Sequence, residues 1–188
     1  MSKPSLVYVL TEDQRQQQLI RRYLIRSGLG THQMQSSPVP AGHGSGEQWV
    51  RANFARQVAA YRLRHARADT ALLAIMDSDN SALHERLLSL DEALEKADVN
   101  PIQEGESIGR LIPKRNIESW IFNLNSEAVN EDEDYKSHRS PEQWSLLIRT
   151  ASEALYKLTR PGVTLPDTLV PSLRHGIGEL SRILSTRE

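Results

Sequence analysis

The sequence predicts an α/β protein with a mostly parallel sheet flanked by helices, and a helical appendage at the C-terminal end. Two apolar runs typical of buried strands, at 6–10 and 71–76, and a further short strand at 108–112 are each followed by a helical pattern. Strands that alternate with helices pair in parallel, because each crossover helix returns the chain to the same end of the sheet. The 188 residues suffice for a core without disulfides.

The elements follow one another in a regular order, separated by residues that start or stop helices. Thr11, Ser81 and Asn116 stand at N-cap positions, and Gly28 and Gly30 follow the end of the first helix. The expected elements are a strand at 6–10, a helix to about 27, a weak strand within 31–40, helices at 47–66 and 81–94, strands at 71–76 and 108–112, and a helix from 117.

Three further segments lie outside this alternation. The glycine-rich loop at 41–46 lacks the lysine of a P-loop and the spacing of a dinucleotide site, so we predict a flexible connector. Helices are expected from Pro141, which suits a first helical position, and from about Pro171. The chain therefore divides into an α/β domain at 1–125, an acidic surface loop at 126–139 and C-terminal helices at 140–188.

The composition excludes several classes of function. The chain has no cysteine, which excludes zinc–thiolate sites and thiol nucleophiles. With a formal net charge of −1, nucleic-acid binding needs a local basic patch. The arginines between 51 and 67 offer one, although such a run is usually a solvated helix face. No apolar segment approaches the ~20 residues of a membrane span, and the N-terminus lacks a signal-peptide pattern, so we expect a cytoplasmic protein with no membrane partner.

Acidic side chains follow two of the predicted strands. Glu12 comes just after the first strand, and Asp77 and Asp79 come just after the strand at 71–76. The carboxyl ends of parallel strands meet at one edge of the sheet, where ligands bind. Residues two apart in an extended chain point the same way, so Asp77 and Asp79 would repel unless a cation such as Mg²⁺ or Mn²⁺ lay between them. Asp79 in a turn, or Glu12 near a helix dipole, is the other interpretation.

The order of these residues resembles the TOPRIM fold of topoisomerases, DnaG-type primases and OLD-family nucleases. Glu12 and the Asp77-Ser-Asp79 segment carry this resemblance. The segment from Ile112 to Trp120 resembles the proline and Glu-x-Trp segment of small stand-alone TOPRIM proteins, including the RloB type, which are often associated with phage defence. The resemblance covers residues 5–125. The family glutamate is usually followed by glycine; here the next residue is aspartate, which leaves open whether that aspartate assists or replaces Glu12.

The resemblance implies a magnesium-dependent nuclease. Asp77 and Asp79 would hold Mg²⁺ or Mn²⁺, and Glu12 would share the metal or act as general acid/base. Lys114 would stabilise the charge that develops on the phosphate, and Glu118 would complete the acidic centre. The resemblance also implies a nucleic-acid partner and a defence role with an ATPase partner. The sequence leaves open whether the chain forms a homo-oligomer.

Two other functions remain open at this point. One is a non-catalytic TOPRIM-like binding or scaffold subunit, which the near-neutral charge and the short chain would suit. The other is a receiver-like phosphoryl-transfer domain. It needs an acidic pair after the first strand, for which Glu12 and Asp13 are available, an aspartate such as Asp77, and a later lysine such as Lys114.

Overall fold

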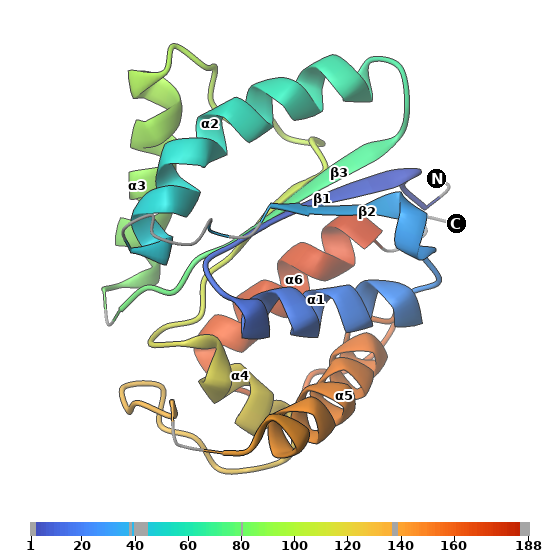
Figure 1. The fold of residues 1–188 in the computed structure, drawn as a ribbon, viewed down its shortest axis with the longest axis vertical. Helices are drawn as coiled ribbons and strands as arrows, with labels where there is room; N and C mark the ends of the chain where they lie inside the picture. The colour runs from blue at the N-terminus through green and yellow to red at the C-terminus, as the bar shows by residue number, and fades with distance from the viewer. Residues whose placement is uncertain (1–2, 38, 40–44, 80, 137–138, 185–188) are drawn as a thin grey trace.

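The computed structural model describes residues 3–37, 39, 45–79, 81–136 and 139–184. In these residues a four-stranded parallel sheet lies between two layers of helices, which confirms the predicted fold class (Figure 1). The elements are β1 (Leu6–Thr11), α1 (Gln14–Arg26), η1 (Thr31–Gln33), β2 (Met34–Ser37), α2 (Gly46–His65), β3 (Thr70–Ile75), α3 (Leu83–Lys96), β4 (Ile108–Leu111), α4 (Ile117–Leu124), α5 (Pro141–Leu158) and α6 (Pro171–Leu184).

The strands are ordered β2-β1-β3-β4, and every neighbouring pair is parallel. The weak strand expected within 31–40 is β2, which pairs with β1 at the edge of the sheet. The chain moves outward from β1 to β2 and then returns across β1 to form β3. The direction of winding therefore changes between β1 and β3, and in open α/β sheets this switch point is where a crevice for ligands forms.

Both faces of the sheet are covered. In Figure 1, α1, α4, α5 and α6 lie on one face, and α2 and α3 lie on the other. Val9 and Leu73 pack into the first layer, whereas Leu10 and Leu72 pack into the second. A strand that is buried on both faces gains from apolar residues at every position, which explains the continuous apolar run of β3.

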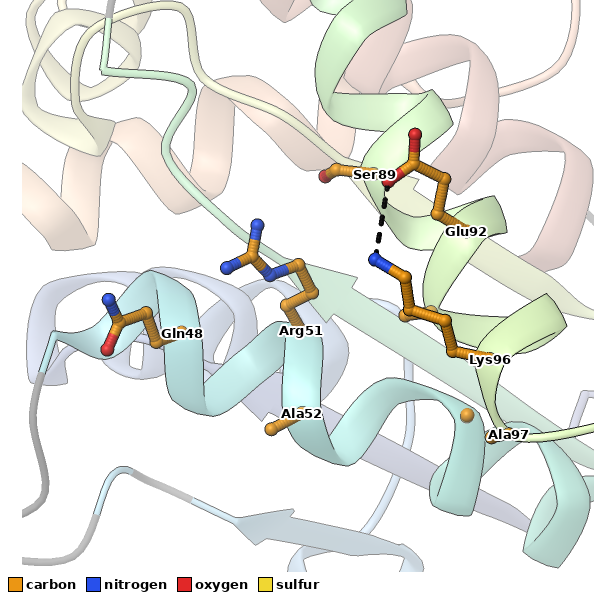
Figure 2. A pocket seen from close by; sticks show the side chains of 9 residues that line it. Gln48, Arg51, Ala52, Ser89, Glu92, Lys96 and Ala97 are labelled. Carbon is orange, nitrogen blue, oxygen red and sulfur yellow. Dashed lines mark ion pairs between the residues drawn. The ribbon is translucent and has the colours of Figure 1, made fainter.

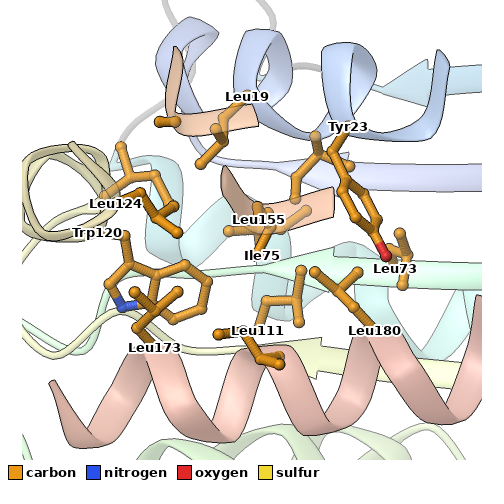
Figure 3. Close-up of a cluster of buried hydrophobic side chains, with 14 of the residues drawn as sticks. Leu19, Tyr23, Leu73, Ile75, Leu111, Trp120, Leu124, Leu155, Leu173 and Leu180 are labelled. Carbon is orange, nitrogen blue, oxygen red and sulfur yellow. The ribbon is translucent and has the colours of Figure 1, made fainter. Parts of the chain in front are cut away.

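The C-terminal helices complete the first layer. Figure 3 shows Leu155 of α5 and Leu173 of α6 in one cluster with Trp120 of α4 and Leu19 of α1. A Cβ added at Gly176 would lie 2.8 Å from Cζ3 of the Trp120 ring, so glycine permits this close approach of α6. The segment predicted as an appendage thus shares its core with the α/β part of the chain.

Two of the predicted helix caps were wrong. Asp13, and not Thr11, caps α1, because its side chain accepts a hydrogen bond of 2.8 Å from the backbone N–H of Gln16. Thr11 is instead the last residue of β1, paired with Ile75. The N-cap of α3 is Ala82 and not Ser81. The cap predicted at Gly28 is confirmed, since this residue follows α1 with a φ of +87°.

The structure also bears on the predicted connector and on membrane crossing. The connector predicted at 41–46 lies outside the described residues as far as position 44, and α2 begins at Gly46. None of the described helices combines the length and the apolar character that a membrane crossing requires.

Candidate functional site

Two carboxylates stand on either side of the switch point. Glu12 directly follows β1, and Asp77 follows β3 after one further residue. From these positions the chain departs in opposite directions, because α1 covers one face of the sheet and α3 covers the other (Figure 1). The sequence-predicted residues Glu12 and Asp77 are therefore brought together where the topology opens the sheet edge.

Hydrogen bonds fix the two loops to each other. The backbone N–H of Asp77 donates to Oε1 of Glu12 at 2.9 Å. The buried side chain of Gln16 accepts from the backbone N–H of Glu12 at 2.9 Å, and it donates to Oδ1 of Asp77 at 2.8 Å. Sequence reasoning missed Gln16. Its position four residues after Glu12, one helical turn away, was the only available signal.

Burial makes both carboxyl groups weak acids. Burial raises the pKa of Glu12 to about 8, against the opposing effect of the hydrogen bond from Asp77 and with a further contribution from the charge of Asp79. Burial also raises the pKa of Asp77 well above its usual value, and the charge of Glu12 adds to this. Without a cation Glu12 is mostly protonated at neutral pH, whereas a bound cation would favour the ionised forms of both groups.

A third carboxylate lies close to this pair. Glu118, in the first turn of α4, is fully buried, and its charge raises the pKa of Asp77. One of its oxygens pairs with the guanidinium of Arg15, whose carbon lies 4.3 Å from the ring centroid of Trp144. The other oxygen, Oε2, has no hydrogen-bond partner among the residues that the structure describes. Buried polar atoms are rarely left unpaired, so this oxygen is a natural point of contact for a ligand.

Asp79 lies beside the pair but points away from Asp77. The side chain of Asp77 is buried at 2% exposure, whereas that of Asp79 is 61% exposed and its Oδ2 lies 3.5 Å from the Arg86 guanidinium. The expectation that Asp77 and Asp79 point together was wrong, because β3 ends at Ile75 and Asp79 adopts a left-handed conformation with φ +48°. Its charge still acts on Glu12.

The start of α2 closes the site from the other face of the sheet. A Cβ at Gly46 would lie 2.8 Å from the Cβ of Glu12 and 2.9 Å from its carbonyl oxygen, so only glycine allows this approach. The neighbouring Glu47 accepts a hydrogen bond of 2.8 Å from Arg86, which also donates to the carbonyl of Ser78 at 3.2 Å. The loop after β3 is thereby joined to α2.

Lys114 is directed at the acidic loop. Its Nζ lies 2.6 Å from Oδ1 of Asp132, and this contact raises the pKa of the ammonium group. The loop is itself anchored, because the buried carboxylate of Glu131 accepts from the hydroxyl of Ser172 near the start of α6. The predicted catalytic lysine thus follows β4 as expected but is paired with the loop rather than with Asp77.

The arginines of α2 are largely engaged within the structure. Arg62 pairs with Glu106 at 2.6 Å, and the Arg64 guanidinium lies 4.0 Å from the ring centroid of Tyr8. Figure 2 shows the pocket between α2 and α3, where Arg51 and the ion pair of Lys96 with Glu92 lie among alanines.

The site offers few carboxylate ligands, and these suit a hard divalent cation. Among the residues that the structure describes, no group of three or more histidine, aspartate or glutamate side chains is arranged to hold a metal ion. Mg²⁺ is often bound by one or two carboxylates, with waters and phosphate oxygens completing its coordination. Glu12 and Asp77 fit that requirement, and the unpaired oxygen of Glu118 lies in the same acidic region.

Comparisons of the chain with protein-family models, with curated proteins and with solved structures gave no match.

Proposed function

We propose that this protein is a magnesium-dependent nuclease whose site is formed by Glu12 and Asp77. The observation that carries the proposal is the placement of the partly buried Glu12 with the buried carboxyl groups of Asp77 and Glu118 at the switch point of a parallel sheet. Only one of the three, Glu118, is paired with a described cationic side chain. The negative charge of a buried carboxylate must be compensated by a proton or by a cation. A divalent ion that also binds a phosphate ester would provide this cation.

Each residue would have a separate role in the reaction. Glu12 and Asp77 would hold Mg²⁺ or Mn²⁺, and Asp79 would add a ligand from its exposed position. The metal would neutralise the phosphate and lower the pKa of an attacking water. Glu118, held by Arg15, would strengthen the negative field at the cation. Lys114 would leave its present partner on the acidic loop, Asp132, and contact the phosphate.

The experiment is a cleavage assay with plasmid, single-stranded DNA and tRNA, each with Mg²⁺, Mn²⁺ or EDTA. We expect divalent-dependent cleavage that Asp77→Asn and Glu12→Gln abolish. Asp167→Asn, on an exposed loop, removes the same charge as a control. Absence of cleavage, both alone and with the product of the neighbouring gene, would refute the proposal, as would full activity in Asp77→Asn. The assay that includes the product of the neighbouring gene also tests the proposed defence role and the proposed ATPase partner.

A non-catalytic TOPRIM-like binding module is the second candidate. One observation favours it: Asp77 is only 2% exposed and is tied to Gln16, so a metal would have to displace existing hydrogen bonds. Titration calorimetry with Mg²⁺ and Mn²⁺, and a pulldown for a stable partner, separate the two. Heat of binding that disappears in Asp77→Asn supports the nuclease; no heat together with a stoichiometric partner supports the module.

A receiver-like domain has less support from the geometry. The side chain of Asp13 is used to cap α1, although its charge also acts on Glu12 and Asp77. Lys114 pairs with Asp132 and not with Asp77. Incubation with acetyl phosphate followed by intact-mass measurement would show a phosphorylated species only if this third function held.

A further inference from the structure

One face of α1 is a polar stripe that contains three arginines. The 13-residue helix contains arginines but no acidic residue. Arg15, Gln18, Arg22 and Arg26 recur at spacings of three or four, so they share one side of the helix. At 1.5 Å per residue, the stripe from Arg15 to Arg26 is roughly 16 Å long.

This stripe borders a groove between α1 and α5. The two helices lie side by side in Figure 1. Arg22 donates to the hydroxyl of Ser145 at 3.2 Å, and Arg26 donates to that of Ser152 at 3.3 Å. Beside these contacts is a surface hollow of about 700 Å³, and Arg149 of α5 lines it opposite the stripe.

Arginines outnumber carboxylates around the groove. Among the described residues, neither Arg21 nor Arg149 forms an ion pair, and Arg22 donates a hydrogen bond to a hydroxyl group. The carboxylate of Glu142 lines the adjoining hollow with Arg22 and Arg149. Arg26 has a carboxylate partner, Glu153, at 3.6 Å. Because the chain as a whole has a net charge of −1, this local concentration of guanidinium groups marks a surface for an anion.

The groove leads to the carboxylate site. Arg15, at the N-terminal end of the stripe, is the residue that pairs with Glu118. A chain of phosphates lying on Arg26 and Arg22 would therefore extend toward Glu118 and Asp77. A free phosphate or nucleotide would use one end of such a stripe, whereas a polyanion would use its full length.

We infer that the groove between α1 and α5 binds the sugar–phosphate backbone of a single-stranded nucleic acid and directs it to the carboxylate site. This inference rests on the proposed function for the chemistry at that site. Ile25 beside the groove is 40% exposed, and Leu146 near Arg149 is 55% exposed. Apolar side chains among the arginines suit unpaired bases, which a duplex would keep hidden.

The test measures binding without chemistry. A fluorescein-labelled oligothymidylate is titrated with the full-length protein in EDTA, and fluorescence anisotropy is followed at several salt concentrations. We expect Arg22→Gln/Arg149→Gln to weaken binding roughly tenfold or more and to reduce the salt slope by about 1.4, the value for two lost phosphate contacts on a single strand. The control, Arg56→Gln/Arg67→Gln, removes the same charge from exposed positions on and just after α2 and should bind like the wild type.

The outcomes separate this inference from the proposed nuclease activity. No binding by the wild type, equal loss in both double variants, or equally tight binding of a duplex would overturn the inference. Groove-dependent binding supports it, whether or not Mg²⁺ or Mn²⁺ then produces cleavage. If the strand binds through the groove but is not cleaved, only the nuclease fails. If cleavage depends on Asp77 but the groove variants bind normally, only the inference fails. Circular dichroism shows that each variant is folded.

Discussion

Glu12→Gln is expected to stabilise the metal-free protein at neutral pH while removing its function. Glutamine has nearly the shape of the protonated glutamate and keeps the oxygen that accepts from the backbone N–H of Asp77. Glutamine cannot ionise, so folding of the variant no longer carries the free-energy cost of keeping a carboxyl group protonated at neutral pH. A gain in stability at a residue needed for activity is the behaviour of a group that is placed for function.

The magnitude follows from the pKa of Glu12, which is about 8 in the folded protein and 4.5 as the reference for the unfolded chain. At pH 7 the unfolded state has lost this proton and the folded state retains it. The folded state therefore binds more protons between these two pKa values, and the free energy of unfolding falls as pH rises from about 4.5 to about 8. At 1.36 kcal/mol per pH unit, the difference between pH 4.5 and pH 7 is about 3 kcal/mol.

The assay is urea unfolding of wild type and Glu12→Gln in EDTA from pH 4.5 to pH 8. The difference in stability should be small at the acidic end and should grow toward about 3 kcal/mol in favour of the variant at pH 7. Asp77 interacts with Glu12, so the difference reports the titration of the pair. Mg²⁺ should stabilise the wild type more as pH rises. Glu104→Gln, on an exposed loop, is the control. Parallel pH profiles for wild type and Glu12→Gln would refute the reasoning.

Two further predictions concern packing and charge around α4. Gly176→Ala should lower stability by about 1–3 kcal/mol in thermal unfolding, because the added Cβ would collide with Trp120. Gly178→Ala, two residues later and facing open space, should raise stability by about 0.5–1 kcal/mol. The reverse order of stabilities would contradict the packing of α6. Arg15→Gln should lower stability by about 3 kcal/mol because Glu118 loses its partner, and adding Glu118→Gln should restore most of the loss; additive losses in the double variant would exclude their pairing.

The fold could be predicted from the sequence because its strands are buried on both faces. Continuous apolar runs predicted β1 and β3, the short segment around Ile108 and Leu111 predicted β4, and the alternation with helical patterns implied parallel pairing. The edge strand β2 was weak because only one side of it is paired and most of its side chains are partly exposed. Placement of the helix caps failed by one or two residues, since β1 continues through Thr11 and side-chain patterns do not define where a strand's last pairing occurs.

The proximity of Glu12 and Asp77 could be predicted from the sequence, but the geometry around them could not. Glu12 and Asp77 follow neighbouring strands, and topology alone brings such residues together. The outward turn of Asp79 depends on a left-handed backbone conformation that an Asp-x-Asp pattern does not reveal. The pairing of Arg15 with Glu118 joins positions far apart in the chain, and only the packing of α1 beside α4 makes it possible.

Two opposite concentrations of charge lie along the same helix, α1. At the N-terminal end of α1, Glu118 and Asp77 concentrate negative charge in a buried region, and along its outer face Arg22 and Arg26 concentrate positive charge in a groove. Each concentration alone is unfavourable, one through desolvation and the other through repulsion between like charges. A phosphodiester backbone accompanied by a divalent cation would neutralise both at once, the phosphates along the groove and the cation at the carboxylates. Arg15 lies at their junction, and this arrangement connects the binding of a strand with its cleavage.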